Sequence, residues 1–596
     1  MKTDSFIREK ILSMTVHPFS RSLIVLGIFS AVMTGAYAQL RPGAGSLLEP
    51  QLPMPGRATS PADPLAPPTQ PRTGGSQANP AQLLDSAVRM TPSAFRFAGN
   101  KVFSGEQLAG LLEGLVGQPS DLLGLSAAAE KVTAYYRAQG YPLTEVYLPQ
   151  QAFAASGGEV TFQVMEVKID RVFLEMEGDG AGMSRTFIDD VIARHLKKGD
   201  DVTDYGLDKP VLLLRDLAGL QATATVEPSA EPGQVNVRVN VKAQGRSADG
   251  SVMLDNHGSW AAGAVRATAT VNISNLLERG DVLSASGQIS EQQGSNMFRV
   301  GYNVPVGGLG TSIGVVAARL NYALGKQFAP LGATGKADVT GLTLLQPLVR
   351  ARATNLYLQA TLEDKRLLDQ TATPVSESRP EIVVTRLGLA GNFEDQWLGT
   401  TALSVYAVHA AIGHLKLDAA DLALDQGLAG LRAAGAFNKV NVDFQRTQYV
   451  TPNASVHLLL QSQWASKNLH SAEKMSLGGP NGVRAYPVGE GIGDSGVLLN
   501  LEYRHQLPAD VSVWGLPLSL SAFYDYGYVR LNQNGPLVAG AANNAQLGGA
   551  GIGAMLGRLG HFTLKTHLAW RGTRGIPASA GADRAPRAWI SLQTWY

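Results

Sequence analysis

Residues 478–494 read Gly-Gly-Pro-Asn-Gly-Val-Arg-Ala-Tyr-Pro-Val-Gly-Glu-Gly-Ile-Gly-Asp. This density of Gly and Pro predicts a loop rather than a helix or a strand. The flanking segments, Ala454–Trp464 and Val497–Gln506, alternate with a period of two, which indicates strands. Long connections without regular structure are uncommon unless they are functional. We therefore expect this loop to fold back into a barrel and Arg484 to hold it there, the alternative being an exposed loop in which Arg484 is incidental.

The same two-residue period extends through the C-terminal part of the chain, from residue 245 to residue 596. Apolar and polar residues alternate strictly in many segments, such as Val265–Ser274 and Leu499–Arg504. In a soluble sandwich the apolar face would meet a second sheet, whereas in an outer-membrane barrel it meets lipid and the polar face lines water. The runs between Val252 and Tyr596 number about 16, and bacterial single-chain barrels have an even strand number. The predicted fold class is an all-β transmembrane barrel of about 16 antiparallel strands, preceded by two small α/β domains.

One predicted strand, Leu516–Tyr528, carries a carboxylate on its polar face. Its outward set is predicted to be Leu516, Leu518, Leu520, Ala522 and Tyr524, and its inward set Ser519, Ser521, Phe523, Asp525 and Gly527. A guanidinium matches a carboxylate with two parallel hydrogen bonds, which an ammonium cannot do. We expect Asp525 to pair with Arg484 in the lumen. The alternative is a solvated carboxylate unrelated to the loop.

The N-terminus carries signals for export. Lys10 and Arg21 precede the apolar run 23–33, and Ala36-Tyr37-Ala38 follows it. This pattern predicts a signal peptide over residues 1–38, with a membrane anchor as the alternative. Residues 39–90 are rich in Pro and predict an extended linker. A short apolar segment, Leu40–Leu52, is a possible plug, although its Pro and Gly residues argue against a long helix.

Residues 91–167 and 168–244 each predict a small α/β domain with the order β-α-α-β-β. In the first, Ser104 and Gln107 form a capping box before one helix, and a second helix is predicted from about Ser126 to Gln139. In the second, Val235, Val237, Val239 and Val241 mark a strand. Strand edges of such domains could receive an extended peptide by β-augmentation. The alternative is that the two domains are spacers.

Composition excludes several other classes of protein. The net charge of +1 gives no indication of nucleic-acid binding, and the absence of Cys excludes disulfides and thiolate sites. His409 and His414 match no metal motif and are better explained as strand residues. Gly549, Gly551 and Gly553 are spaced by two with no helix after them, so they predict a strand with room for a packed loop. No catalytic cluster or cofactor motif emerges, so we expect no enzyme activity, no metal and no cofactor.

These residues resemble the TpsB transporters of two-partner secretion, the haemolysin-activator and filamentous-haemagglutinin type, within the wider superfamily of POTRA-bearing outer-membrane barrels. Val483, Arg484 and Tyr486 match the family pattern Val-Arg-Gly-Phe/Tyr, and Phe523, Asp525 and Gly527 match Phe-x-Asp-x-Gly. The resemblance covers about Phe95 to Tyr596. One departure is Ala485, which stands where the family has Gly; Ala would strain or displace the tip if the site needs a positive φ or a close backbone approach.

The resemblance implies that the loop enters the lumen and that its Arg meets the strand carboxylate. It also implies an outer-membrane location, periplasmic POTRA domains, and a partner that is a secreted TpsA-type exoprotein, adhesin-like or haemolysin-like. The function expected is capture of this unfolded partner in the periplasm and its export through the barrel. The alternatives are an outer-membrane assembly or insertion factor of the same superfamily and a passive porin.

Overall fold

The computed structural model describes residues 44, 47, 90–151, 158–177, 182–243, 247–428, 430–535, 540–572 and 585–596. The predicted signal peptide (1–38) lies outside the described residues. Of the predicted linker (39–90), only Ala44, Leu47 and Met90 are described. No helix in the described ranges is both long enough and apolar enough to cross a membrane.

The first α/β domain is a three-stranded sheet covered by helices. Its elements are β1 (Ala94–Ala98), α3 (Gly105–Gly110), the 3-10 turn η1 (Glu113–Leu115), α4 (Leu122–Ala138), β2 (Glu145–Tyr147) and β3 (Glu159–Met165). β3 lies between β1, to which it is parallel, and β2, to which it is antiparallel. The Ser104–Gln107 capping box is present at the start of α3. The predicted start of the second helix at Ser126 was wrong, because Asp121 accepts a hydrogen bond from the Gly124 N–H and begins α4 at Leu122.

The second α/β domain repeats this arrangement. Its elements are β4 (Lys168–Glu177), α5 (Arg185–His195), α6 (Asp204–Arg215), β5 (Leu220–Pro228) and β6 (Gln234–Ala243). The central strand β6 is parallel to β4 and antiparallel to β5. Val237, Val239 and Val241 of β6 are buried against α5 and α6 in one apolar cluster. Each domain therefore has a core of its own.

The rest of the chain is a closed antiparallel barrel, to which the described residues contribute sixteen strands and a short extension. In chain order, the first eight strands of the barrel are β7 (Ser247–Asp255), β8 (Arg266–Ser274), β9 (Val282–Ser290), β10 (Ser295–Val306), β11 (Thr311–Ala323), β12 (Thr334–Arg350), β13 (Thr354–Ala372) and β15 (Glu381–Asp395). The short strand β14 (Val375–Ser378) extends the pairing of β13. The remaining strands are β16 (Ala402–Lys416), β17 (Gly435–Thr451), β18 (Ala454–Ala465), β21 (Ser495–Gln506), β22 (Leu518–Arg530), β23 (Asn544–Arg558), β24 (Phe562–Arg571) and β25 (Arg587–Trp595). β25 pairs with β7 and closes the cylinder. The predicted fold class is confirmed.

Short helical elements occur in the connections between strands. They are α7 (Ala419–Gln426) and the 3-10 turns η2 (Glu291–Gln293), η3 (Lys326–Leu331), η4 (Trp397–Gly399), η5 (Ser471–Glu473) and η6 (Ala509–Val511). A two-stranded sheet of β19 (Met475–Ser476) and β20 (Ile492–Gly493) lies within the connection from β18 to β21. This connection is residues 466–494, called the re-entrant loop below.

The two faces of β22 differ as the period of two predicts. Leu520 and Tyr524 are exposed on the outer face, whereas Phe523 and Asp525 are buried. Leu516 was expected in the same outward set, but the strand begins only at Leu518. The Leu516 backbone instead bonds with Val513, at 2.9 and 3.1 Å, within the preceding turn.

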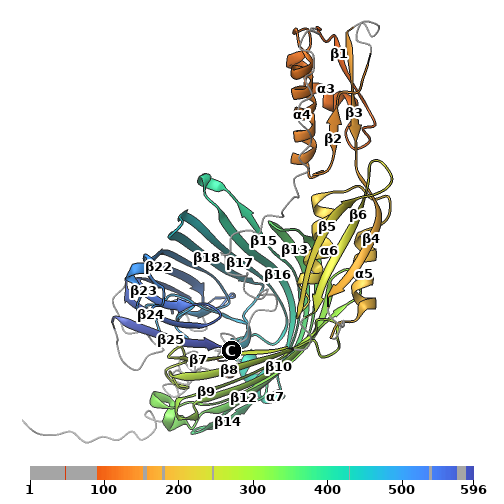
Figure 1. Ribbon diagram of the computed structural model, residues 1–596. Coiled ribbons are helices and arrows are strands. Elements are labelled where there is room, and N and C mark those ends of the chain that lie inside the picture. The colour runs from red at the N-terminus through yellow and green to blue at the C-terminus, as the bar shows by residue number, and fades with distance from the viewer. Residues whose placement is uncertain are drawn as a thin grey trace, which may run out of the picture.

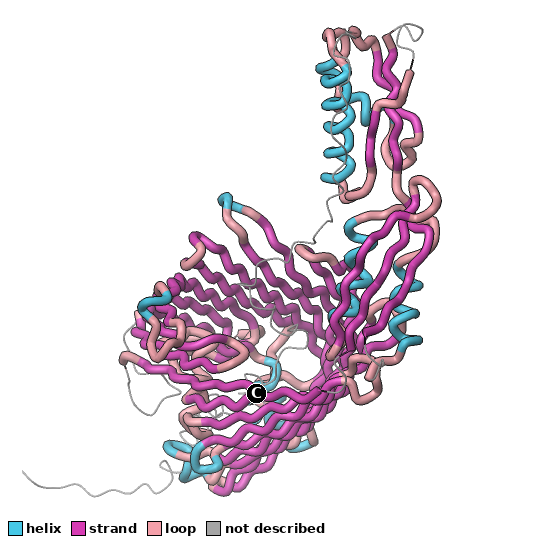
Figure 2. Tube along the Cα trace, viewed as in Figure 1, coloured by secondary structure: helices cyan, strands magenta, loops and turns pink. Residues whose placement is uncertain are grey.

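The two α/β domains stand one above the other on one rim of the barrel (Figure 1). The second domain contacts the short turns of that rim: Arg350 donates two hydrogen bonds to Asp216, at 2.8 and 2.7 Å, and Arg352 donates one to Asp208 at 2.6 Å. The Ser184 N–H donates to the Glu278 carbonyl at 2.7 Å. Figure 2 shows that strands dominate the molecule and that helices gather mainly in these two domains.

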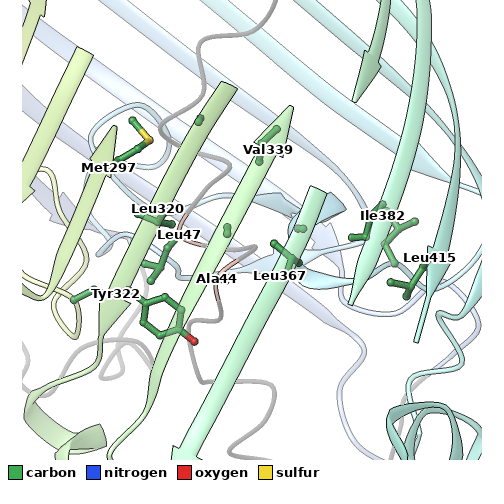
Figure 3. Packing of buried hydrophobic residues seen from close by; sticks show 14 of the residues in the cluster. Ala44, Leu47, Met297, Leu320, Tyr322, Val339, Leu367, Ile382 and Leu415 are labelled. Carbon is green, nitrogen blue, oxygen red and sulfur yellow. The ribbon is translucent and has the colours of Figure 1, made fainter. Parts of the chain in front are cut away.

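Ala44 and Leu47, in the segment expected to hold a plug, are both helical and lie inside the barrel. They are 0% and 5% exposed and pack among wall residues such as Leu320 and Tyr322 (Figure 3). The Ala44 N–H donates to Asp369 Oδ1 at 2.9 Å. The barrel interior at this level is therefore occupied by residues from the N-terminal part of the chain.

Candidate functional site

The re-entrant loop folds on itself inside the barrel. β19 pairs with β20, and beyond them the Val483 N–H donates to the Leu477 carbonyl at 2.7 Å. The Tyr486 carbonyl accepts from the Gly479 N–H at 3.1 Å. Val483, Ala485 and Tyr486 are 0%, 1% and 5% exposed. The loop tip is therefore a packed hairpin inside the barrel, and the alternative of an exposed loop was wrong.

Arg484 and Asp525 are brought together by this fold. Arg484 Nη2 lies 2.8 Å from Asp525 Oδ1, and its Nε donates to Asp525 Oδ2 at 2.9 Å. The Arg484 backbone N–H also donates to Oδ2 at 3.0 Å. Two parallel side-chain bonds fix both the distance and the plane of the guanidinium. A third bond from the backbone fixes the loop itself to the same carboxylate.

Two further residues complete the surroundings of the guanidinium. Arg484 Nη1 donates to Glu502 Oε2 at 2.5 Å, and Glu502 also accepts from Arg504 Nε at 2.7 Å. The centre of the guanidinium stands 3.4 Å from the centroid of the Phe523 ring, a cation–π contact. Each nitrogen of the guanidinium therefore donates to a carboxylate, which a buried cation requires.

The backbone of the loop tip is bound separately from its side chains. Asn500 Nδ2 donates to the Gly482 carbonyl at 2.9 Å and to Asp525 Oδ1 at 2.7 Å. Trp589 Nε1 donates to the Arg484 carbonyl at 2.7 Å. The hairpin tip thus contacts β21, β22 and β25. We call the set formed by Arg484, Asp525 and Glu502 the tip contact.

Ala485 does not show the strain that a positive φ would cause, because it is not among the non-glycine residues with positive φ. Room for its methyl group comes from the wall. A Cβ atom on Gly549 of β23 would lie 2.5 Å from the Ala485 Cβ, which is too close for two carbon atoms. Likewise a Cβ on Gly527 would lie 2.8 Å from Leu477 Cδ2. Glycine residues on the inner wall therefore leave space for the side chains of the loop.

Gly551 and Gly553 of β23 leave room for neighbouring side chains. A Cβ on Gly551 would lie 2.4 Å from the Phe523 ring, and one on Gly553 would lie 2.6 Å from both His567 and Ser521. His409 of β16 lies 2.7 Å from Gln359 and, like His414, belongs to a barrel strand. Across the described ranges, no group of His, Asp and Glu side chains is arranged to hold a metal ion.

Sequence reasoning missed three members of the site: Glu502, Asn500 and Trp589. Period two had placed Asn500 and Glu502 on one polar face, so a search for partners of Arg484 on that face would have found them. Trp589 is 105 residues from Arg484 in the chain. The curvature of the wall through β22, β23 and β24 brings β25 to the loop tip, so no local signal indicates this contact.

Comparisons with known proteins agree with this architecture. The family model described as haemolysin secretion/activation protein ShlB/FhaC/HecB matches residues 233–553, and the model for the POTRA domain, ShlB-type, matches residues 90–166. The heme/hemopexin transporter protein HuxB of Haemophilus influenzae is 25% identical over 466 residues, covering 78% of this chain and 80% of HuxB. The outer membrane transporter CdiB of Dickeya dadantii (strain 3937) is 21% identical over 432 residues, covering 71% of this chain and 72% of CdiB.

A solved structure has the same fold. The structure of CdiB from Escherichia coli superposes with a TM-score of 0.65 at 18% sequence identity, and the match covers 98% of this chain and 100% of that one. At this identity the comparison shows the fold alone.

Proposed function

Since the chain belongs to the family of haemolysin secretion/activation proteins of the ShlB/FhaC/HecB type, we propose a role for each of its parts in exporting a protein. Members of this family are outer-membrane transporters of two-partner secretion, with POTRA domains in the periplasm and a secreted exoprotein as partner. This chain is such a transporter. We assign roles in transport, and none in catalysis, to its second α/β domain and its re-entrant loop, and we propose a class of client.

The client is proposed to be a TpsA-type exoprotein, adhesin-like or haemolysin-like, that reaches the periplasm unfolded. Both α/β domains offer sheet edges for strand addition: β1 and β2 flank the first sheet, and β4 and β5 flank the second. An extended chain that adds to such an edge gains main-chain hydrogen bonds without needing a folded surface. The second domain shares the strand and helix order of the first and its parallel and antiparallel pairings, which supports treating it as a POTRA domain too.

The barrel is proposed to conduct the client once its interior is cleared. Leu47 and the re-entrant loop both occupy that interior, so a polypeptide can pass only after they move. The observation that carries this proposal is the buried tip contact, in which Arg484 joins the loop to Asp525 on the inner wall. Val483, Ala485 and Tyr486 are proposed to pack the tip, and Phe523, Asp525 and Gly527 to receive it.

Deleting the gene and profiling the culture medium and the outer membrane tests the function. Loss of one large secreted protein, restored by the wild-type gene, is the result expected. A general loss of barrels would instead indicate an assembly factor, and a change confined to solute uptake would indicate a porin. Complementation with Asp525→Asn, compared with Asp255→Asn as a buried carboxylate that pairs with Arg266 and does not bind Arg484, tests whether the tip contact takes part.

A further inference from the structure

The re-entrant loop has a second buried ionic contact, 11 residues before Arg484 in the chain. Glu473, in η5, is 0% exposed. Its carboxylate lies 2.7 Å from Lys365 Nζ of β13 and 2.8 Å from Lys439 Nζ of β17, and 3.8 Å from Arg386 Nη2 of β15. Three strands of the wall thus direct cations at one carboxylate of the loop. We call this set the stem contact.

The main chain at Glu473 is fixed by the same wall. Lys439 Nζ and Gln463 Nε2 both donate to the Glu473 carbonyl, each at 2.9 Å. Glu363 of β13 contacts Arg386 at 2.6 Å and Lys365 at 3.5 Å. Two carboxylates therefore face three cations. Removing Glu473 would leave the cations short of a counter-charge in a buried site, which is costly.

The start and end of the loop are joined into one unit near the stem contact. Asp494, 0% exposed, lies 2.8 Å from Lys474 Nζ and accepts from the Leu469 N–H at 3.0 Å. It also accepts from the Gln533 N–H, in the connection after β22, at 2.8 Å. Lys474, next to Glu473, is therefore bound through Asp494 to a connection outside the loop.

The two contacts use different parts of the barrel. The stem contact involves β13, β15 and β17, and the tip contact involves β21 and β22. Figure 1 shows β13 and β15 on one side of the barrel and β22 on the other. The two contacts share no residue, so no bond of Arg484 is also a bond of Glu473. Distant sites that share no partner usually contribute to stability additively.

We propose that Glu473 is a positioning residue of the transport channel, which keeps the stem of the re-entrant loop on the wall independently of Arg484. The lumen is cleared only when both the tip contact and the stem contact are broken. This inference rests on the proposed function for its meaning in transport. Its physical content, two independent contacts, can be tested without any client.

The absence of Cys in the chain allows a clean test. Val483→Cys places a thiol in the buried tip, and Ala472→Cys places one in the buried stem, where the residues are 0% and 2% exposed. In the full-length protein in liposomes, the rate at which each thiol reacts with a maleimide measures how often that part of the loop leaves the wall. Glu473→Gln, Asp525→Asn, their combination and the control Asp255→Asn are compared in both backgrounds.

We expect Glu473→Gln to speed labelling of the stem thiol at least about tenfold and to leave the tip thiol protected. Asp525→Asn should do the reverse. The combination should speed both and raise the mean conductance in planar bilayers by more than the sum of the single effects. Glu473→Asp should restore part of the stem protection, since it keeps the charge. Asp255→Asn, whose bonds are to Arg266 and His257, should change neither rate.

Faster labelling of the stem thiol in Asp525→Asn alone would overturn the proposal, because it would show that the loop leaves as one piece. Continued protection of the stem thiol in Glu473→Gln would overturn it equally. Each variant is first checked for a folded barrel by its mobility on unheated gels. Secretion is measured separately, so a failed client assignment does not alter the outcome of the labelling.

Discussion

The methyl group of Ala485 occupies space that exists only because residue 549 is Gly. A Cβ atom built on Gly549 would stand 2.5 Å from the Ala485 Cβ and 2.9 Å from the Trp570 carbonyl oxygen. The backbone of Ala485 has no positive φ, so the fit between loop and wall is a matter of volume and not of backbone strain. Ala at 485 and Gly at 549 together provide a contact in which only one partner carries a methyl group.

Gly549→Ala should displace the loop tip from the wall. The added methyl group overpacks a buried contact, which typically costs about 1–3 kcal/mol. We expect faster maleimide labelling of Val483→Cys and a higher mean conductance in planar bilayers.

Gly548→Ala is the matched control, because a Cβ there would meet only the Tyr524 hydroxyl, at 3.8 Å. It should leave labelling and conductance unchanged. Equal effects of the two substitutions would show that the strand, and not the loop contact, is disturbed.

Arg484→Lys should weaken the tip contact even though it keeps the positive charge. An ammonium cannot reproduce the two parallel bonds to Asp525, and each charge-assisted bond contributes about 1.5–3 kcal/mol. Secretion and tip labelling of Arg484→Lys, Asp525→Asn and the double variant should be strongly non-additive. Arg266→Lys, at the separate pair with Asp255, is the control. If the effects of the two single substitutions on secretion and labelling were additive, Arg484 and Asp525 would act independently of each other.

Trp589→Phe should loosen the tip without breaking its ion pair. The substitution removes the Nε1–H that donates to the Arg484 carbonyl at 2.7 Å, and loss of one buried hydrogen bond costs about 1 kcal/mol. We expect labelling of Val483→Cys to rise about fivefold. Trp570→Phe, on the exposed outer face of β24, should have no such effect, and protection equal to wild type in Trp589→Phe would contradict the assignment.

Acid should weaken the second α/β domain at its junction with the barrel. Burial lowers the pKa of His195 from its ordinary value of 6.5, with Lys209 adding to the effect and a backbone hydrogen bond with Gly308 opposing it. A His whose folded pKa is lowered stabilises the folded state above 6.5, and that stability is lost as the pH falls below 6.5 towards the folded pKa.

The measurement is the rate of limited proteolysis between the domain and the barrel at pH 8 and pH 5. We expect His195→Gln to reduce the difference between the two pH values. His561→Gln, at an exposed position of a turn on the same rim, should keep it. If the proteolysis rate of His195→Gln changed between pH 8 and pH 5 as much as that of the wild type, the pH dependence would arise from other groups.

Much of the barrel follows from period two. Leu520 and Tyr524 of β22 face outward and Asp525 faces inward, as the period of two predicts, so Asp525 could be placed in the lumen from the sequence. The capping box of Ser104 and Gln107 was likewise local and was found. The start of α4 was placed too late, because Asp121 was not recognised as its cap.

The remainder of the site depends on how the sheet curves around the loop. Glu473 lies in a Gly-poor part of the loop with no motif around it, and its cationic partners come from strands 34 to 108 residues away in the chain. Their meeting depends on the register of several strands and on the path of the loop across the lumen. No pattern along the sequence indicates either of these, so the stem contact had to be observed.

The closing seam has a bearing on how the molecule is made. β25 meets β7 through five residue pairs, from Ser591 opposite Asp255 to Trp595 opposite Ser251, and Tyr596 exchanges two backbone hydrogen bonds with Gly250 beyond them. Asn256 exchanges side-chain bonds with Ala588 and Ile590, 332 and 334 residues further along the chain. Contacts so distant in sequence form late. The barrel therefore cannot close before the last strand is present. A nascent chain truncated before residue 587 would remain an open sheet with two unpaired edge strands.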